Sequence, residues 1–173
     1  MKLNFFLLLG LSIFSSFILC SFFNPPHVRA AYNVMESFTK KMKKEGFRSV
    51  GSGGAMMDDV QQISLDYEIY QKLDVCQARM LFLKEAEALL HDINCNLKIR
   101  PYLHDYPSTC KNIFLTISFV APNQMFVEPP YIAYVGLHKD KVVYSTFDKD
   151  AGKLVNIYEE PYEQALKIYK DTK

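Results

Sequence analysis

The feature that most limits the fold of this chain is a strict alternation of apolar and polar residues between Gln62 and Tyr70. The apolar positions are Ile63, Leu65, Tyr67 and Ile69. A period of two predicts a β-strand with one apolar and one polar face. The segment 113–119 alternates in the same way, with apolar residues at 113, 115, 117 and 119. We therefore expect a sheet that other elements cover on one side only.

Helical periodicity flanks these strands. The strongest helix is predicted for 75–93, where Asp74 and Gln77 have the spacing of a capping box. Shorter helices are predicted at 31–45 and from Pro161 onward, and the glycine-rich segment 51–54 is predicted to be a loop. Further strands are predicted at 47–50, 131–137, 142–147 and 154–158. This order predicts an α+β fold: an antiparallel sheet of about five to six strands with helices packed mainly on one face.

Residues 1–30 have the pattern of a signal peptide or membrane anchor, and residues 31–173 have the length of a single α+β domain. After Lys2, the segment 5–23 runs for 19 residues without a charge. Three outcomes stay open: cleavage before Ala31, retention of 5–23 as a membrane anchor, or lipid attachment at Cys20. Each one predicts an exported protein, whether periplasmic, secreted or membrane-anchored.

The charge balance argues against a nucleic-acid partner. The whole chain has a net charge of +1, and residues 31–173 carry 18 basic and 19 acidic side chains. Nucleic-acid binding normally needs a basic excess on one face. The lysines at 40, 41, 43 and 44 instead fit the solvated end of a helix. We expect a protein or envelope partner of unknown identity, and no cofactor.

Three cysteines lie beyond residue 30, an odd number for an oxidising compartment. Cys95 and Cys110 bracket a short loop and are the predicted disulfide, while the helical pattern around Cys76 predicts a small buried side chain. The alternative, that all three are free thiols, stays open.

The loop after the long helix is the best candidate for a binding site. It gathers a cation, two phenols, an imidazole and a carboxylate, at Arg100, Tyr102, His104, Asp105 and Tyr106. Long loops on a rigid scaffold often bind a ligand. The alternative is structural: the loop plugs the end of the sheet, and its polar side chains bond to loop carbonyls and cap turns.

Three short motifs resemble a group of small exported proteins of intracellular bacteria. The motifs are Gly53-Gly54, the stretch 99–103 (Ile-Arg-Pro-Tyr-Leu) and Glu160-Pro161-Tyr162. The resemblance spans most of the domain and implies export. No activity is assigned to that group, so it implies no catalytic residue here.

Other chemistry finds little support in the sequence. A metal set of His91, Cys95, His104 and Cys110 matches no zinc module, and no metal site or catalytic residue is predicted. The leading hypothesis is a non-enzymatic binding module that uses the 97–111 loop and aromatic residues on the open face of the sheet, among them Tyr144. The alternatives are a small thiol- or histidine-dependent hydrolase and a membrane-anchored envelope structural protein.

Overall fold

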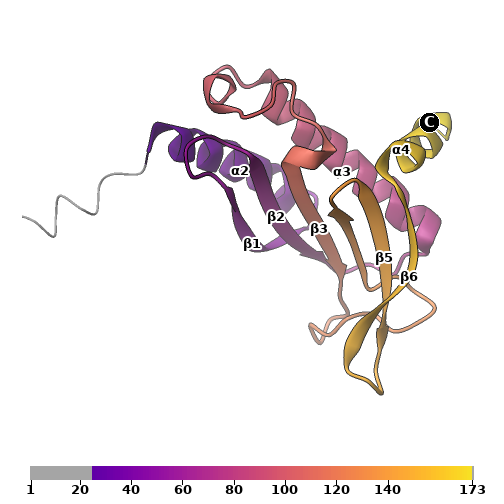
Figure 1. Ribbon diagram of the computed structural model, residues 1–173. Coiled ribbons are helices and arrows are strands. Elements are labelled where there is room, and N and C mark those ends of the chain that lie inside the picture. The colour runs from indigo at the N-terminus through magenta and orange to yellow at the C-terminus, as the bar shows by residue number, and fades with distance from the viewer. Residues whose placement is uncertain (1–24, 173) are drawn as a thin grey trace, which may run out of the picture.

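Six strands form one sheet in chain order, and three α-helices accompany it in the computed structural model, which describes residues 25–172 (Figure 1). The strands are β1 (Arg48–Ala55), β2 (Gln62–Ile69), β3 (Ile113–Phe119), β4 (Tyr134–His138), β5 (Lys141–Asp148) and β6 (Lys153–Pro161). The helices are α2 (Pro26–Lys44), α3 (Val75–Cys95) and α4 (Tyr162–Asp171). The α+β class and the strand number are confirmed. The apolar segment 5–23 and Cys20 lie outside the described residues.

One strand pair makes the sheet mixed rather than antiparallel throughout. β2 and β3 run parallel, whereas each of the other neighbouring pairs is antiparallel. The connection between β2 and β3 contains α3, and a crossover helix returns the chain to the end of the sheet from which it started. The predicted long helix between these strands is thus the reason for the parallel pair.

The alternating strands bury the face that the sequence predicts. Leu65, Leu115 and Ile117 are fully buried, while Ser64 and Glu68 on the opposite face remain partly exposed. Helices α2 and α3 lie on the same side of the sheet (Figure 1). The α3 helix begins at the predicted capping box. The Asp74 carboxylate accepts from the Gln77 N–H at 2.8 Å, and the Gln77 side-chain oxygen accepts from the Asp74 N–H. Within residues 25–172, no helix is both long and apolar enough to cross a membrane.

The glycine-rich segment is a strand instead of the predicted loop. Residues 51–55 pair with 62–66, and the glycines serve close approach rather than flexibility. A Cβ atom on Gly54 would lie 2.1 Å from the Gln62 carbonyl oxygen, and one on Gly51 would lie 2.5 Å from the Asp66 carboxylate. Pairing with β2 therefore outweighs the weak strand preference of glycine.

Helix α2 begins at Pro26, five residues before the predicted start. His27 is buried and its Nε2 atom lies 3.0 Å from the Met56 carbonyl oxygen, so the first turn of α2 is tied to the segment after β1. Proline suits this first helical position because its missing N–H would have no partner there.

A buried ion pair joins α3 to the C-terminal end of β6. The Arg79 guanidinium donates to both Glu160 carboxylate oxygens, at 2.7 and 3.2 Å, and the Tyr144 hydroxyl donates to the same carboxylate at 2.8 Å. Burial alone would lower the pKa of Arg79, but bonding to Glu160 outweighs it and raises that pKa above its ordinary value. Tyr144, predicted on the open face, is thus buried on the helix side, where burial and then Glu160 raise its pKa.

The face assignment predicts unequal effects for two substitutions. Leu115→Ala removes a fully buried side chain and should cost about 2 to 5 kcal/mol in the free energy of unfolding. Ser64→Ala, on the open face, should change it by less than about 0.5 kcal/mol. Urea denaturation measures both, and equal losses would show that the face assignment is wrong.

The buried ion pair gives a second prediction. Glu160→Gln leaves the Arg79 cation buried without a counter-charge and should cost about 3 to 5 kcal/mol in the free energy of unfolding. The matched control is Glu159→Gln, because Glu159 pairs with Lys141 at 2.5 Å on the exposed surface, where such pairs contribute about 0 to 1 kcal/mol. Thermal and urea unfolding would contradict the prediction if both variants lost the same small amount.

Candidate functional site

The loop that carries the predicted site residues is ordered by its own hydrogen bonds. The Asn94 side chain bonds to both the N–H and the carbonyl of Ser108, at 2.7 and 2.9 Å, and so ties the two ends of the loop together. The Asp105 carboxylate accepts from the Asn112 side chain at 2.8 Å. Two short 3-10 turns, η1 (Arg100–Tyr102) and η2 (Cys110–Asn112), complete the segment.

Backbone bonds fasten this loop to the segment between β1 and β2. The Val60 N–H donates to the Tyr102 carbonyl at 2.8 Å, and the His104 N–H donates to the Val60 carbonyl at 3.0 Å. The His104 Nδ1 atom lies 2.6 Å from the Asp59 carboxylate. The loop thereby meets a carboxylate that the sequence analysis did not single out, 45 positions away in the chain.

The predicted site residues divide into two groups. Tyr102 and His104 face the 56–61 segment, where Tyr102 is half-buried with its ring centroid 6.5 Å from that of His27. Arg100 instead stacks over the Tyr106 ring at 4.6 Å and donates to the Asn94 carbonyl at 3.2 Å. Asp105 is used to hold Asn112. Much of the predicted cluster therefore shapes the loop itself, as the structural alternative proposed.

The ring of His104 is exposed beside the Asp59 carboxylate. Its bond to Asp59 raises the pKa of His104, and the same bond lowers the pKa of Asp59. A carboxylate fixes the orientation of an imidazole and leaves the other ring nitrogen, Nε2, toward solvent. Among the described residues, the hydrogen-bond partner of the His104 ring is the Asp59 carboxylate.

The cysteines do not form the predicted disulfide in the structure. Cys95 is exposed, with its Sγ atom 3.7 Å from His91 Nδ1, whereas Cys110 is buried near α4, where burial raises its pKa. The two thiols therefore point into different surroundings. Cys76, predicted to be buried, is exposed in the first turn of α3, with its sulfur 3.9 Å from the Arg79 guanidinium.

Of the four residues in the metal-binding alternative, only two lie close together. His91 and Cys95 come together on α3, while His104 faces Asp59 and Cys110 faces α4. Across residues 25–172 no three His, Cys, Asp or Glu side chains converge on a metal position.

A second candidate site, which the sequence analysis missed, is a groove of about 270 Å³ between α2 and β1. Its lining residues are Tyr32, Met35, Glu36, Thr39, Lys40, Lys43, Ser49 and Ser52. Along β1, the side chains at 49 and 52 face α2, as their register partners Tyr67 and Leu65 do. Two small serines beside a helix leave the space that larger residues would fill. The sequence pattern predicts a loop at 51–54, and a loop there gives no sign of a groove beside a strand.

The groove runs beside an unpaired strand edge. β1 pairs with β2 on one side, and no described strand pairs with its other side. The regular stretch 51–55 is about 17 Å long, and its three glycines have no side chains beside the outer backbone groups.

Comparison with known proteins yields no relative. A scan against protein-family models finds no match, and searches of the curated proteins and of the solved structures find none either.

The pairing of His104 with Asp59 predicts a pH dependence. Because the pKa of His104 is raised, the pair stabilises fully below about pH 6.5, and this contribution is lost as the pH rises through the raised value. On the acid side it is lost as the pH falls through the lowered pKa of Asp59. In an NMR titration, Asp59→Asn should move the His104 midpoint down toward about 6.5. Asp58→Asn, at an exposed neighbour, should leave it in place, and an unchanged midpoint in Asp59→Asn would contradict the pairing.

Proposed function

We propose that this protein is an exported, non-enzymatic interaction module that binds an extended peptide segment of a partner protein along β1. The observation that carries the proposal is the open edge of β1 beside the α2 groove. An extended peptide can add a strand to such an edge, so that main-chain hydrogen bonds supply affinity and a neighbouring groove selects side chains. Export rests on the apolar run 5–23, which lies outside the described residues.

The groove favours a peptide of particular chemistry. Tyr32, which is exposed, offers apolar surface beside the buried Met35, and this suits one apolar side chain at every second peptide position. Lys40 is partnered by Glu36 at 2.7 Å, whereas Lys43 has no ion-pair partner among residues 25–172. We therefore expect an acidic residue near Lys43, next to the apolar position.

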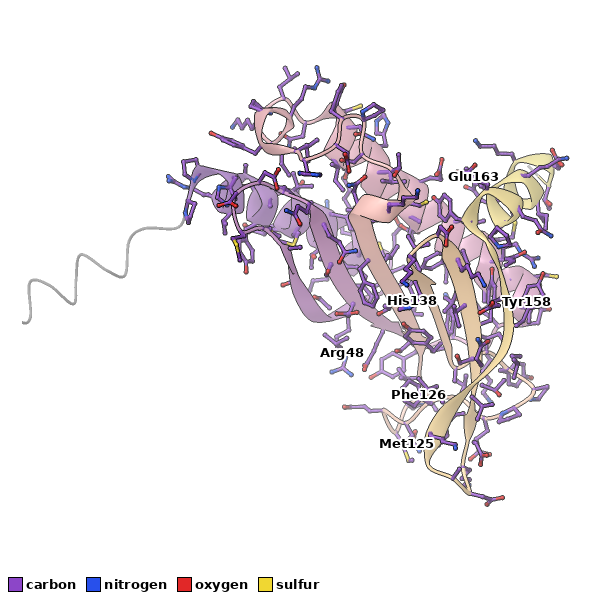
Figure 2. The ribbon with its side chains drawn as sticks, in the orientation of Figure 1. Arg48, Met125, Phe126, His138, Tyr158 and Glu163 are labelled. Atoms are coloured by element: carbon purple, nitrogen blue, oxygen red, sulfur yellow. The ribbon has the colours of Figure 1, made fainter. Side chains whose placement is uncertain are left out.

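The opposite edge of the sheet is less suited to strand addition. The register irregularity of β6 falls at Ile157, in the middle of the strand, whereas that of β1 falls at Val50, before the regular stretch 51–55. The Asn156 side chain also accepts from the Tyr158 N–H at 3.1 Å. A bulge and an occupied edge donor both hinder the pairing of another strand. Tyr158 on this edge is labelled in Figure 2.

The loop around His104 is a second candidate contact surface, because its imidazole, its Arg100–Tyr106 stack and Tyr102 are at least partly exposed. Stacked arginine and tyrosine side chains are frequent anchors at protein interfaces. This surface would extend the contact beyond the end of β1, since the 56–61 segment joins the two.

The proposal predicts the outcome of a peptide selection. A displayed library of random heptapeptides, selected on the immobilised protein, should enrich alternating apolar and acidic residues. Hydrogen exchange of the complex should then show protection of the 51–55 amides. Ser52→Tyr, which fills the groove, should weaken the selected peptides at least tenfold.

The matched control is Gly53→Ala, because Gly53 faces the other side of the sheet and its added Cβ has no neighbour within 4 Å. It should leave affinity unchanged. Protection that maps to β6 or to the His104 loop, or peptides insensitive to Ser52→Tyr, would contradict binding at β1.

A further inference from the structure

A hollow of about 540 Å³ lies on the open face of the sheet, the face opposite to the α2 groove. Its lining residues are Gln62, Lys111, Phe114, His138, Lys139 and Asp140. His138, labelled in Figure 2, is the last residue of β4 and directly precedes the turn into β5. The hollow is thus separate from the edge to which we assign peptide binding.

The strand alternation directs three of these side chains into the hollow. Gln62, Phe114 and His138 are neighbours in sequence of the buried Ile63, Leu115 and Leu137, so they project from the opposite face. Phe114 is half-buried on a face whose other β2 and β3 positions are mostly polar. Its ring gives the hollow a flat apolar surface, and Gln62 adds an amide.

Two lysines at the rim carry charge that the described residues do not neutralise. Lys111 and Lys139 have no ion-pair partner within residues 25–172, unlike Lys141 and Lys149, which pair with Glu159 and Glu128. One carboxylate, that of Asp140, also lines the hollow and opposes an anion. Two ammonium groups against one carboxylate still leave an excess of positive charge.

The position of Lys139 is unusual for a lysine. It occupies the two-residue turn between β4 and β5 with φ at 59°, a left-handed conformation that asparagine and glycine adopt more readily. The turn is also anchored, because the Asp140 carbonyl accepts from the Tyr162 N–H at 2.8 Å. A charged side chain is therefore held at the rim by a turn whose local preference is for another residue, which is typical of a functional position.

We propose that this hollow binds a small organic anion that carries a flat aromatic group. The acid group would contact the Lys111 and Lys139 ammonium groups, and the aromatic group would stack on the Phe114 ring. The Gln62 amide and the His138 ring supply hydrogen bonds that orient the ligand. This site is independent of the peptide groove, so each can fail without the other.

The test is an NMR titration of the ¹⁵N-labelled protein with phenyl phosphate, inorganic phosphate and phenol as separate probes. Phenyl phosphate should shift the amide signals of 111–114 and 138–141 in a saturable manner. It should bind at least tenfold more tightly than either inorganic phosphate or phenol. Equal binding of inorganic phosphate and phenyl phosphate would reduce the site to a pair of surface lysines and overturn the proposal.

Substitutions of the two lysines and of Phe114 test the same proposal separately, through the charge and through the aromatic ring. Lys139→Asn removes the charge while suiting the left-handed turn, and together with Lys111→Gln it should weaken phenyl phosphate at least tenfold. Phe114→Leu should weaken it without changing the affinity for inorganic phosphate. Lys149→Gln, at a distant hairpin, is the control and should have no effect. Unchanged affinity in the double lysine variant, with its amide spectrum otherwise intact, would overturn the proposal.

Discussion

The pairing of Arg79 with Glu160 joins the helical layer to the far edge of the sheet, across 81 positions of sequence. Within the sheet β6 pairs with β5 only, and α4 starts directly after its last residue. The Tyr144 and Tyr158 hydroxyls, at 2.8 and 3.3 Å, complete the shell of donors around the Glu160 carboxylate. A buried carboxylate that accepts from this many donors is held in one geometry. Tyr162 then extends the link, because its hydroxyl donates to Glu87 of α3 at 2.7 Å.

Helices α2 and α3 lie on one side of the sheet, so its other face is open. The two edge strands, β1 and β6, differ in how well they could pair with a further strand. At the β6 edge, a bulge at Ile157 and the Asn156 side chain, which accepts from the Tyr158 N–H, hinder the pairing of another strand. β1 has its irregularity at Val50, before the regular stretch 51–55, and its small residues leave a groove beside α2. On the open face, Phe114 and the β4–β5 turn form a hollow, and Tyr134 and Val143 are further apolar side chains of that face. The α2 groove and the hollow lie on opposite faces of the sheet, so the side chains that a peptide would contact there differ from those that a small anion would contact.

The sequence predicted those parts of the fold in which local pattern and burial agree. The alternation in β2 and β3 identified the buried face, and Asp74 with Gln77 located the start of α3. The loop prediction for 51–54 was wrong. Glycine by itself indicates a loop, whereas here the glycines are required by the close approach of Gln62 and Asp66 in the adjacent strand. The His104–Asp59 pair could not be predicted for the same reason, since 45 residues separate partners that only the packed loop brings together. The composition of 97–111 indicated a candidate binding loop. It could not show that Arg100 and Asp105 are used within the loop, whereas the His104 ring is exposed.

The start of α2 bears on how the N-terminal segment can be processed. The predicted cleavage position, between Ala30 and Ala31, lies inside a helix whose first turn is held by His27 against Met56 and near Tyr102. Proteases cut extended, accessible backbone, so a helical Ala30–Ala31 bond is a poor substrate once the domain has folded. Cleavage there would have to precede folding, and it would remove His27, a side chain that belongs to the buried contact between α2 and the 56–61 segment. That segment also positions Asp59 for His104, so the first turn of α2 supports the candidate loop indirectly. A cut upstream of Pro26, or retention of the segment, would leave this contact intact.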